Sequence, residues 1–505
     1  MRSFTSPVDA ARWLRSRVPG TLCSDSRRLR AGDGFLAWPG AASDARSHVR
    51  EVLARGAAAC LVEQSGVAAY GFADERVASF EQLKTASGPL AAAYFDNPSA
   101  QLAVVAITGT NGKTSSAWWL AQALSRLKHP LMPCGLVGTL GIGQVPLAEG
   151  DSSALQPSGL TTPDAVLLQQ SFRQFVQAGL KACAIEASSI GLAEGRLAGT
   201  QIRSAIFTNF TQDHLDYHGS MAQYWEAKAA LFRWPGLSSA VINIDDAHGA
   251  SLAFEVAQRV PDVWTVSCQQ TARLQACDIK QGAVGLEFVV CEGQQRHSVA
   301  TALIGHYNLA NLLGVMAAMR ALGVPLAEVA SVCASLSPVP GRMQRVNSAA
   351  GALAVVDYAH TPDALAKALQ ALRGLADARG GRLWCLFGCG GDRDRAKRPL
   401  MGAMAEQHAD QVLLTSDNPR SESPQAIIAQ IAAGVSQPSR LLVEPDRARA
   451  IAQALGAAGA HDVVLIAGKG HELYQEVGGQ RLAFSDVQQV LLARPRQTAS
   501  VQGQA

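Results

Sequence analysis

The sequence predicts an α/β protein of three domains, with a phosphate-binding loop in the central one. A glycine-rich segment at 109–114 lies between an apolar run at 102–106 and a helical pattern at 115–127, which is the strand–loop–helix order of a nucleotide-binding domain. Short β-type runs alternate with helical patterns along the rest of the chain, as in parallel sheets covered by helices. A length of 505 residues corresponds to about three or four domains, and we expect three.

The composition argues against two classes of partner. The 44 Lys and Arg residues are nearly balanced by 41 Asp and Glu residues, so the basic excess of a nucleic-acid-binding protein is missing. The N-terminus lacks the apolar region of a signal peptide, and no apolar run approaches the ~20 residues that cross a bilayer. The ten cysteines stand singly in apolar runs, which predicts reduced core residues rather than zinc ligands. We therefore expect a cytoplasmic protein that binds neither nucleic acid nor membrane.

Turn-forming residues indicate the domain boundaries. The tetrapeptide 96–99 (Asp-Asn-Pro-Ser) precedes the strand of the phosphate loop, and 335–341 contains two prolines and a glycine after an alanine-rich helical stretch, which indicates a hinge. The end of the chain carries no periodic apolar pattern. The predicted parts are a small N-terminal α/β domain at 1–98, a central domain at 99–337, a C-terminal domain at 338–492 and a disordered tail at 493–505.

The glycine-rich segment has the residues of a phosphate cradle. Two glycines allow backbone N–H groups to close on phosphate oxygens, Lys113 supplies a positive charge, and Thr114 offers a hydroxyl to Mg²⁺. Ile107 stands where a generic P-loop has glycine, so this is a shortened form of the loop. A mere turn between strand and helix is disfavoured by Gly-Lys-Thr at the helix start. The sequence predicts ATP binding at Gly109, Thr110, Asn111, Gly112, Lys113 and Thr114.

Three further apolar runs in the central segment, at 182–185, 204–207 and 240–244, predict strands of the same parallel sheet. Ligands of such sheets bind beyond the carboxyl ends of the strands. Glu186 follows the first run and His214 lies in the loop after the second, so the pair is a candidate for a second Mg²⁺ site. A single loop histidine is more often structural, and only the company of Glu186 and Lys113 favours a functional role.

Lys228 lies in an amphipathic helical pattern at 224–232. From these residues alone, the favoured interpretation is a lysine that extends along a solvated helix face toward water.

The C-terminal segment predicts a second sheet, with strands at 353–356, 383–387, 412–414 and 463–466. Each strand ends in a polar cluster, and the clusters include Arg393, Arg420 and Lys469. Any one cluster could be an ordinary turn, but four in one sheet predict a rim that binds an anionic ligand.

Together these motifs resemble the Mur ligase superfamily, over essentially the whole chain. The resemblance is carried, in the expected order, by Gly109–Thr114, Glu186–Ser189, Asp213–Gly219, Asn308, Asn311, Gly341–Met343, Asp357–Pro362 and Gly468–Glu472. It implies a three-domain architecture: an N-terminal domain for the UDP end of the substrate, a central P-loop ATPase domain and a C-terminal Rossmann-like domain for the amino acid. It also implies an ATP-dependent ligase that extends UDP-N-acetylmuramoyl-dipeptide through an acyl phosphate. We expect this ligase to be a monomer.

The resemblance assigns further site residues. Contacts to the UDP substrate are implied for Ser24, Ser26, Ala41, Ala42, Ser43, Thr161, Thr162, Ser188, Glu194 and Arg196, and contacts to ATP for Asn308, Arg342 and Asp357. Lys228 aligns with a lysine that relatives carry as a carbamate formed from CO₂. A carbamate would turn this cation into an anionic ligand of Mg²⁺, alongside Thr114, Glu186 and His214. The implied catalytic residues are Lys113, Glu186, His214 and Lys228.

The segment Asp417-Asn418-Pro419-Arg420 resembles the signature of members that add meso-diaminopimelate. Diaminopimelate is lysine with a second carboxylate at its far end. A guanidinium can hold that carboxylate through charge-assisted hydrogen bonds worth ~1.5–3 kcal/mol each, whereas lysine would bring an ammonium to the same place. The implied diaminopimelate residues are Arg393, Asp417, Asn418, Pro419, Arg420, Gly468 and Glu472.

Two positions depart from the family pattern, and two other functions compete. Ile190 stands where relatives commonly have histidine, and Glu194 replaces a neutral glutamine of some relatives. A folylpolyglutamate synthetase would share the phosphate loop and the hinge, but neither the Asp-Asn-Pro-Arg segment nor the N-terminal domain is expected in it. A P-loop ATPase that acts as a switch, without a covalent product, would hydrolyse ATP independently of any amino acid. A purely structural role leaves the strand-end clusters unexplained.

Overall fold

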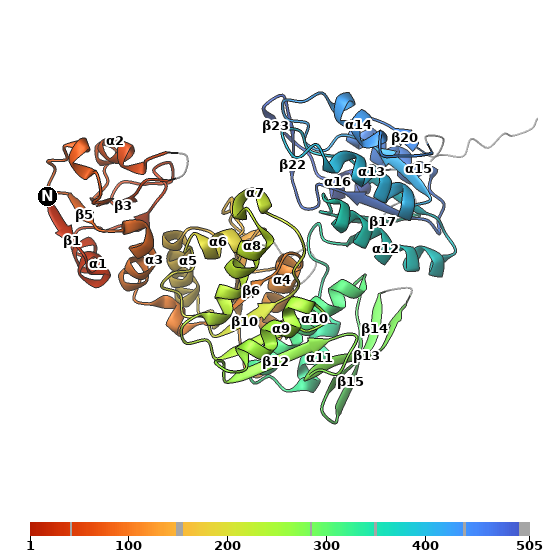
Figure 1. Cartoon of the computed structure of the whole chain (residues 1–505), viewed down its shortest axis with the longest axis horizontal. Helices are drawn as coiled ribbons and strands as arrows, with labels where there is room; N and C mark the ends of the chain where they lie inside the picture. Colours follow the sequence, from red (N-terminus) through yellow and green to blue (C-terminus); the bar gives the residue numbers. More distant parts are fainter. Residues whose placement is uncertain (41–42, 148–154, 283–284, 348–350, 438–440, 494–505) are drawn as a thin grey trace, which may run out of the picture. The chain divides into compact units, whose positions relative to one another are not determined.

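The structure, a computed structural model, describes residues 1–40, 43–147, 155–282, 285–347, 351–437 and 441–493 (Figure 1). The predicted substrate residues Ala41 and Ala42 and the predicted tail after Ala493 lie outside these ranges. Internal contacts divide the chain into two compact units. The first comprises Met1–Ala276, Val290–His297 and Ala310–Cys333, and the second comprises Cys277–Val289, Ser298–Leu309 and the residues from Ala334 onward. The boundary predicted after residue 98 falls inside the first unit, so it stays a prediction.

The first unit begins with a five-stranded parallel sheet of order β1-β5-β4-β3-β2. This sheet and its helices lie where the small N-terminal α/β domain is predicted. The predicted turn is present, because Asp96 and Asn97 both have positive φ, at 63° and 49°. The elements are β1 (Arg2–Phe4), α1 (Pro7–Arg15), β2 (Leu22–Cys23), β3 (Gly34–Ala37), α2 (Val49–Ala54), β4 (Ala59–Glu63), β5 (Val77–Phe80) and α3 (Leu83–Tyr94).

A ten-stranded sheet follows, in the order β15-β14-β13-β12-β11-β10-β6-β9-β7-β8. The strands from β13 to β7 pair in parallel, and β8 is antiparallel to β7. Its strands are β6 (Ala103–Thr108), β7 (Cys134–Gly138), β8 (Gly141–Gly143), β9 (Ala182–Glu186), β10 (Ser204–Phe207), β11 (Ser239–Asn243), β12 (Asp262–Ser267), β13 (Leu274–Gln281), β14 (Leu286–Glu292) and β15 (Gln295–Ala300). The helices are α4 (Lys113–Arg126), α5 (Ala165–Gln177), α6 (Ser189–Ala193), α7 (Leu215–His218), α8 (Met221–Ala229), α9 (Ala247–Val256), α10 (His306–Ala321) and α11 (Leu326–Ala334).

The register of this sheet positions the phosphate loop. Strand β6 lies between β9 and β10, with Ile107 opposite Glu186 and Thr108 opposite Phe207. All six residues of β6 are buried, as expected for a central parallel strand covered on both faces. The three other strands predicted in this segment are confirmed to within one residue at each end. The loops that follow β6, β9 and β10 therefore leave the sheet at the same edge.

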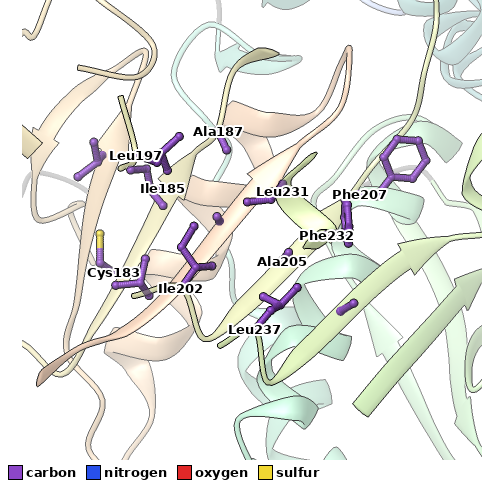
Figure 2. Packing of buried hydrophobic residues seen from close by; sticks show 14 of the residues in the cluster. Cys183, Ile185, Ala187, Leu197, Ile202, Ala205, Phe207, Leu231, Phe232 and Leu237 are labelled. Atoms are coloured by element: carbon purple, nitrogen blue, oxygen red, sulfur yellow. The ribbon is translucent and has the colours of Figure 1, made fainter. Parts of the chain in front are cut away.

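A buried apolar cluster anchors the helix that carries Lys228. Figure 2 shows Leu231 and Phe232, which follow α8, against Ala205 and Phe207 of β10. Leu231 and Phe232 are at most 2% exposed, and burial of such side chains stabilises the fold by roughly 1.5–3 kcal/mol each. This packing holds the end of α8 against the sheet beside the phosphate loop.

The second unit contains a six-stranded sheet of order β16-β17-β21-β18-β19-β20, parallel except for β16. Alternate residues of its strands belong to two separate cores: Val355 and Leu465 pack with α12 and α13, whereas Val356 and Ile466 pack with α15 and α16. Helices therefore cover both faces, as in a Rossmann-like domain. The four strands predicted here are confirmed, and they share one sheet.

The elements of this unit are β16 (Gln344–Asn347), β17 (Leu353–Asp357), α12 (Pro362–Arg379), β18 (Leu383–Phe387), α13 (Lys397–His408), β19 (Gln411–Leu414), α14 (Pro424–Ala432), β20 (Leu441–Val443), α15 (Arg447–Ala457), β21 (Val463–Ala467) and α16 (Asp486–Leu492), with a hairpin of β22 (Tyr474–Val477) and β23 (Gln480–Ala483). Within the described ranges, no helix has the length and apolar character needed to cross a membrane.

Candidate active site

The phosphate loop depends on two glycines that leave no room for a side chain. Gly109 and Gly112 have φ values of 147° and 89°, which L side chains rarely adopt. A Cβ at Gly109 would lie 1.9 Å from the hydroxyl oxygen of Thr208, and a Cβ at Gly112 would lie 2.3 Å from Oδ1 of Asn311. Helix α4 begins directly after Gly112, so its first N–H groups and its positive dipole end face the loop.

Lys113 and Thr114 take up different positions at the start of α4. Lys113 folds back over the loop, where Nζ donates to the carbonyls of Gly109 and Thr110, both at 2.8 Å. The Thr114 hydroxyl donates to Oε2 of Glu186 at 2.8 Å, while the backbone N–H of Thr139 donates to Oε1 at 2.7 Å. Glu186 is 1% exposed. The Glu186 carboxylate and the Thr114 hydroxyl, both predicted to bind Mg²⁺, are thus in direct hydrogen-bond contact.

Lys228 is buried against the same loop, so the interpretation of a solvent-facing lysine is wrong. Its side chain is 1% exposed, Nζ donates to the Gly109 carbonyl at 2.8 Å, and Nζ lies 4.3 Å from the ring centroid of Tyr224. Burial, reinforced by the positive charge of Lys113, lowers the pKa of Lys228 well below its usual value, and Asp213 opposes this only in part. Tyr224 stands one helical turn before Lys228, a spacing that could have indicated the contact from sequence.

His214 occupies a strained position at the start of α7. Its φ is 50°, its side chain is 44% exposed, and Nε2 lies 3.5 Å from Oδ2 of Asp213. Its ring meets that of Tyr224 edge-on at 6.1 Å. Across the described ranges, no group of three or more His, Cys, Asp and Glu side chains is gathered as a metal site.

Four residues predicted to contact the dipeptide cluster beside Glu186. The Thr162 hydroxyl donates to the Glu186 carbonyl at 2.7 Å and lies 2.9 Å from the Ser188 hydroxyl. Arg196 donates to the Thr162 carbonyl at 3.1 Å, and the Thr161 and Thr139 hydroxyls are 3.0 Å apart. This network connects the predicted dipeptide residues with the carboxylate beside the phosphate loop.

Glu194, one of the two departures from the family pattern, is neutralised by partners that the sequence did not indicate. Lys84 of α3 donates to its carboxylate at 2.6 Å, and the Tyr217 hydroxyl donates at 2.5 Å. The hydrogen bonds from Lys84 and Tyr217 lower the pKa of Glu194. Lys84 lies 110 residues away in the chain, and no local pattern signals such a contact. The other departure, Ile190, is half-buried in α6, and nothing in the structure explains it.

The serines predicted to bind the uridine end lie in the first sheet and its loops. The Ser24 hydroxyl donates to Asp164 at 2.9 Å, and Asp164 also caps the N-terminus of α5. The carbonyl of Ser26 accepts from Arg55 at 2.9 Å, and Ser43 is exposed. Ser24 and Ser26 are both half-buried.

Three residues predicted to contact ATP belong to the second unit. The Asp357 carboxylate ends β17 and accepts from the N–H groups of Met343 and Ala359 at 2.7 and 2.8 Å. Burial raises the pKa of Asp357, while the positive charge of Arg342 opposes the rise. The Arg342 guanidinium lies 4.6 Å from the Tyr358 ring centroid. Asn308 donates to the Ile304 carbonyl at 2.8 Å.

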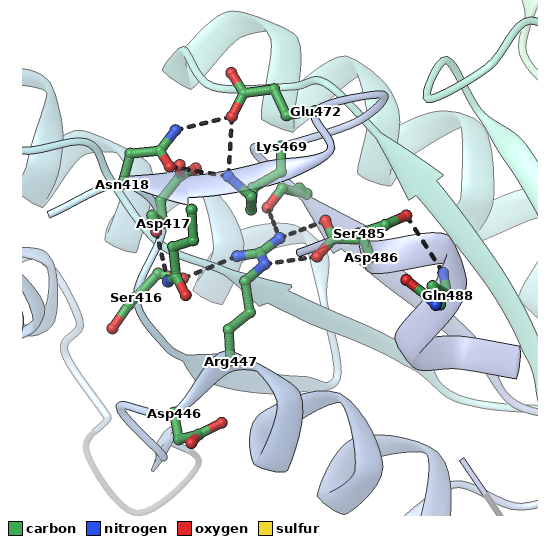
Figure 3. Close-up of polar contacts among 12 residues, drawn as sticks. Ser416, Asp417, Asn418, Asp446, Arg447, Lys469, Glu472, Ser485, Asp486 and Gln488 are labelled. Carbon is green, nitrogen blue, oxygen red and sulfur yellow. Dashed lines mark hydrogen bonds and ion pairs between the residues drawn. The ribbon is translucent and has the colours of Figure 1, made fainter. Parts of the chain in front are cut away.

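Polar groups of the second sheet surround Asn418, which follows β19. Asn418 Nδ2 donates to Glu472 at 2.8 Å, and Lys469 donates to both Asn418 and Glu472 (Figure 3). Gly468 has a φ of 113°, and a Cβ there would lie 2.4 Å from Oδ2 of Asp417. Three predicted diaminopimelate residues thus lie beside Gly468 at one edge of the sheet.

The two arginines of the predicted anion rim differ in their contacts and exposure. Arg420, with a φ of 52°, donates from Nη1 to the Gly391 carbonyl at 2.7 Å and lies 3.4 Å from the Glu476 carboxylate. Arg393 is exposed in the loop after β18. Lys469 does not belong to the rim, because it is fully buried and paired with Glu472. That part of the prediction is wrong.

Comparison with known proteins identifies the family. Residues 107–319 match the family model described as Mur ligase middle domain, and residues 341–470 match that of the Mur ligase glutamate ligase domain. The chain belongs to the Mur ligase family. The resemblance predicted from the motifs is therefore confirmed, and with it the fold class and an ATP-dependent ligase activity.

The similarity of this Mur ligase to named relatives covers nearly its whole length. It is 57% identical over 491 residues to the UDP-N-acetylmuramoyl-L-alanyl-D-glutamate--2,6-diaminopimelate ligase of Acidovorax sp. (strain JS42), covering 96% of this chain and 97% of that protein. The protein of the same name from Janthinobacterium sp. (strain Marseille) is 46% identical, with 95% of each chain covered. A solved structure of a ligase with this name is 36% identical, with a TM-score of 0.66 and 93% of each chain covered.

Proposed function

We propose that this Mur ligase adds meso-diaminopimelate to the D-glutamate of UDP-N-acetylmuramoyl-L-Ala-D-Glu, with ATP as co-substrate, in the synthesis of peptidoglycan precursors. The proposal rests on the 57% identity, along nearly the whole chain, to a 2,6-diaminopimelate ligase. It is supported by three predicted diaminopimelate residues of the second unit, Asp417, Asn418 and Glu472, which lie beside Gly468 at one edge of the sheet. Because ATP and a UDP-linked precursor are substrates, we place the reaction in the cytoplasm, and we propose a monomer with the domains at 1–98, 99–337 and 338–492.

The first step joins the substrate carboxylate to phosphate. The side-chain carboxylate of D-glutamate attacks the γ-phosphate of ATP, the bond to the β-phosphate oxygen breaks, and an acyl phosphate and ADP form. Lys113 and the N–H groups at the start of α4 offset the charge on the transferred phosphoryl group. In the second step the amine attacks the acyl carbon, and phosphate leaves as the amide forms.

The residues beside the loop fit Mg²⁺. Thr114 and Glu186 offer oxygen atoms that are already hydrogen-bonded to each other, and oxygen is the ligand that Mg²⁺ prefers. We propose that Thr114, Glu186, His214 and a carbamate on Lys228 would hold the ions. Bound Mg²⁺ neutralises phosphate charge. Lys228 fits carbamate formation because burial favours its neutral amine, which is the form that reacts with CO₂.

The adenine and ribose side of ATP is assigned to Asn308, Arg342 and Asp357 of the second unit. Two buried polar atoms support a ligand there, since Nε of Arg342 and Nδ1 of His471 lack a hydrogen-bond partner within the described part of the chain. Burial, with the charge of Arg342, lowers the pKa of His471 to about 4, so its ring is neutral at pH 7 and one nitrogen can accept a hydrogen bond.

For the acceptor we propose a clamp in which Arg420 holds the far carboxylate of diaminopimelate and Arg393 lies near its other carboxylate, with Asn418 and Glu472 beside one of its amino-acid groups. Asp417, Pro419 and Gly468 shape the backbone of this site. Arg420 is preorganised, because the Gly391 carbonyl and Glu476 hold its guanidinium.

For the UDP substrate we propose contacts with Ser24, Ser26, Ala41, Ala42, Ser43, Thr161, Thr162, Ser188, Glu194 and Arg196. Lys84 and Tyr217 already donate hydrogen bonds to the Glu194 carboxylate, so the proposed contact between Glu194 and the UDP substrate depends on these two partners.

The test is ADP release by the purified protein with ATP, Mg²⁺ and UDP-N-acetylmuramoyl-L-Ala-D-Glu, in the presence of meso-diaminopimelate, L-lysine or no amino acid. We expect sustained release only with diaminopimelate. For Arg420→Ala we expect a loss of diaminopimelate activity on the order of 10²-fold or more, because a charge-assisted contact to the far carboxylate disappears. If Arg420→Ala discriminated against lysine as strongly as the parent, the clamp would be wrong.

The same assay separates the two competing functions. Equal ADP release with and without an amino acid would support an ATPase switch. Release that depends on glutamate and a folate would support a folylpolyglutamate synthetase. The similarity to a 2,6-diaminopimelate ligase covers 96% of the chain, including the N-terminal domain, and argues against both alternatives.

A further inference from the structure

Lys469 is held in the interior of the second unit by the backbone around it. It follows β21 and lies between Gly468 and Gly470, which have φ values of 113° and 53°. A Cβ at Gly470 would lie 2.8 Å from the Gly341 carbonyl oxygen. The Lys469 side chain is 0% exposed. Burial of an ammonium group costs free energy unless its N–H groups donate hydrogen bonds. The hydrogen-bond partners of Lys469 therefore indicate its role.

The ammonium of Lys469 connects two residues of the proposed diaminopimelate site. Nζ donates to Oδ1 of Asn418 at 3.0 Å and to Oε2 of Glu472 at 2.9 Å, and Nδ2 of Asn418 also donates to Oε2 of Glu472, at 2.8 Å. Figure 3 shows the three side chains in a closed triangle. Nζ also lies 5.7 Å from the Tyr474 ring centroid.

These bonds determine which atoms remain for a ligand. An ammonium only donates, so the Asn418 atom that it contacts must be the amide oxygen, and the N–H of Glu476 bonds the same oxygen at 2.9 Å. One N–H of Asn418 and Oε1 of Glu472 are then left without a partner in the described part of the chain. A donor beside an anionic acceptor matches the carboxylate and the amino group of an amino acid.

The neighbouring ion pair serves a different purpose. Arg447 and Asp486, both fully buried, bond through two contacts of 2.7 Å, and Arg447 also donates to the carbonyls of Ser416 and Ala467 (Figure 3). This pair joins the backbones at the ends of β19 and β21. Lys469, in contrast, bonds only side chains of the site, so its contacts orient those groups rather than join strands.

We propose that Lys469 is a positioning residue. It orients Asn418 and Glu472 so that they recognise one carboxylate and one amino group of the acceptor substrate. The inference rests on the proposed function, because it assigns a role within the diaminopimelate site. Lys469 does not contact the substrate. It keeps the Asn418 amide from rotating, and it keeps the charge of Glu472 in place with one oxygen free.

The test compares Lys469→Met with the parent protein and with Lys367→Met as a matched control, since Lys367 pairs with Asp363 on the exposed surface of α12. For Lys469→Met we expect the KM for diaminopimelate to rise on the order of 100-fold, because Glu472 and Asn418 lose a charged hydrogen-bond partner. We expect the KM values for ATP and the UDP-dipeptide, and acyl-phosphate formation without an amino acid, to stay within about twofold. Lys367→Met should match the parent in all four measurements.

Two results would overturn the proposal. An unchanged KM for diaminopimelate would exclude an orienting role. An equal loss in every parameter together with a lower Tm would assign Lys469 to folding alone. If Lys469→Met fails to fold, Lys469→Arg keeps the charge with a different geometry, and it should still raise the KM for diaminopimelate at least about tenfold. An unchanged KM in that variant would equally exclude the role. If the parent itself releases no ADP with diaminopimelate, the proposed function is wrong, and this outcome is distinct from a failure of the Lys469 inference alone.

Discussion

The surroundings of Lys228 differ from those that its local sequence pattern predicts. Its helix position resembles that of a solvated lysine, yet its ammonium lies against the Gly109 carbonyl and the Tyr224 ring, with Lys113 close enough to disfavour its charge. At its usual pKa of about 10.4 only roughly 0.04% of such an amine is neutral at pH 7. The lowered pKa of Lys228 raises that fraction, which is what reaction with CO₂ requires.

A stability measurement tests the environment of Lys228. Between the lowered pKa of the folded state and about 10.4, the unfolded chain binds one proton more than the folded chain, so the free energy of unfolding rises with pH over that window. In CO₂-free buffer we expect Lys228→Met to have a higher Tm than the parent at pH 7, and the difference to shrink as the pH approaches 10. A lower Tm for the variant at pH 7 would contradict a buried lysine without a carboxylate partner.

Activity measurements test the carbamate. Added bicarbonate should stimulate ADP release by the CO₂-depleted parent, and the stimulation should fall as the pH drops through the pKa of Lys228, because protonated amine cannot react. Lys228→Met should be inactive with or without bicarbonate. Stimulation of both proteins to the same extent would assign the effect to another site.

Among the elements, the phosphate loop and α4 have the conformation that the sequence predicts. The strand, the two glycines and the helix start coincide with the motif because each depends on local backbone preference. The hairpin of β22 and β23 had no such signal, since its strands are short and partly exposed. Its backbone nevertheless bonds Arg420 on both sides, through the Glu476 carbonyl and the Gly478 N–H.

Gly112→Ala tests the element that holds phosphate. The new Cβ would meet the buried side chain of Asn311 at 2.3 Å in a left-handed conformation, at a cost on the order of 1–3 kcal/mol. We expect a KM for ATP raised at least about tenfold and a Tm lowered by several degrees. Gly374→Ala is the matched control, because Gly374 lies in α12 with open space around its Cβ and should gain about 0.5–1 kcal/mol. A Gly112 variant with normal ATP kinetics would refute the tight loop.

Across the whole chain, the cysteines behave as the predicted core residues. All ten are free, and Cys23, Cys268 and Cys277 alone among them are not fully buried. Burial raises the pKa of the Cys60, Cys134 and Cys333 thiols to about 12. We therefore expect Ellman's reagent at pH 8 to react with at most three thiols in the folded protein and with ten in denaturant. Rapid reaction of more than three would show that the cores open, and fewer than ten in denaturant would reveal a disulfide.

The strands, the phosphate loop, the family and the strand-end positions of Glu186, Asp357 and Asn418 followed from the sequence. Each depends on neighbours within a few residues, such as an apolar run, a glycine pair or a short motif, and local backbone preference and burial carry that information. The parallel order of the strands then places their polar ends at one edge without further detail.

The burial of Lys228 and Lys469 and the pairing of Glu194 with Lys84 were decided by the tertiary structure. Lys228 meets a carbonyl 119 residues away, Lys469 bonds an amide 51 residues away, and Lys84 lies 110 residues from Glu194. Whether a lysine is solvated, neutral or paired depends on the dielectric and the charges that folding brings around it. The contacts with Gly109, Asn418 and Lys84 come from distant segments, so no local periodicity or spacing reports them, although the helical spacing of Tyr224 and Lys228 is compatible with their contact.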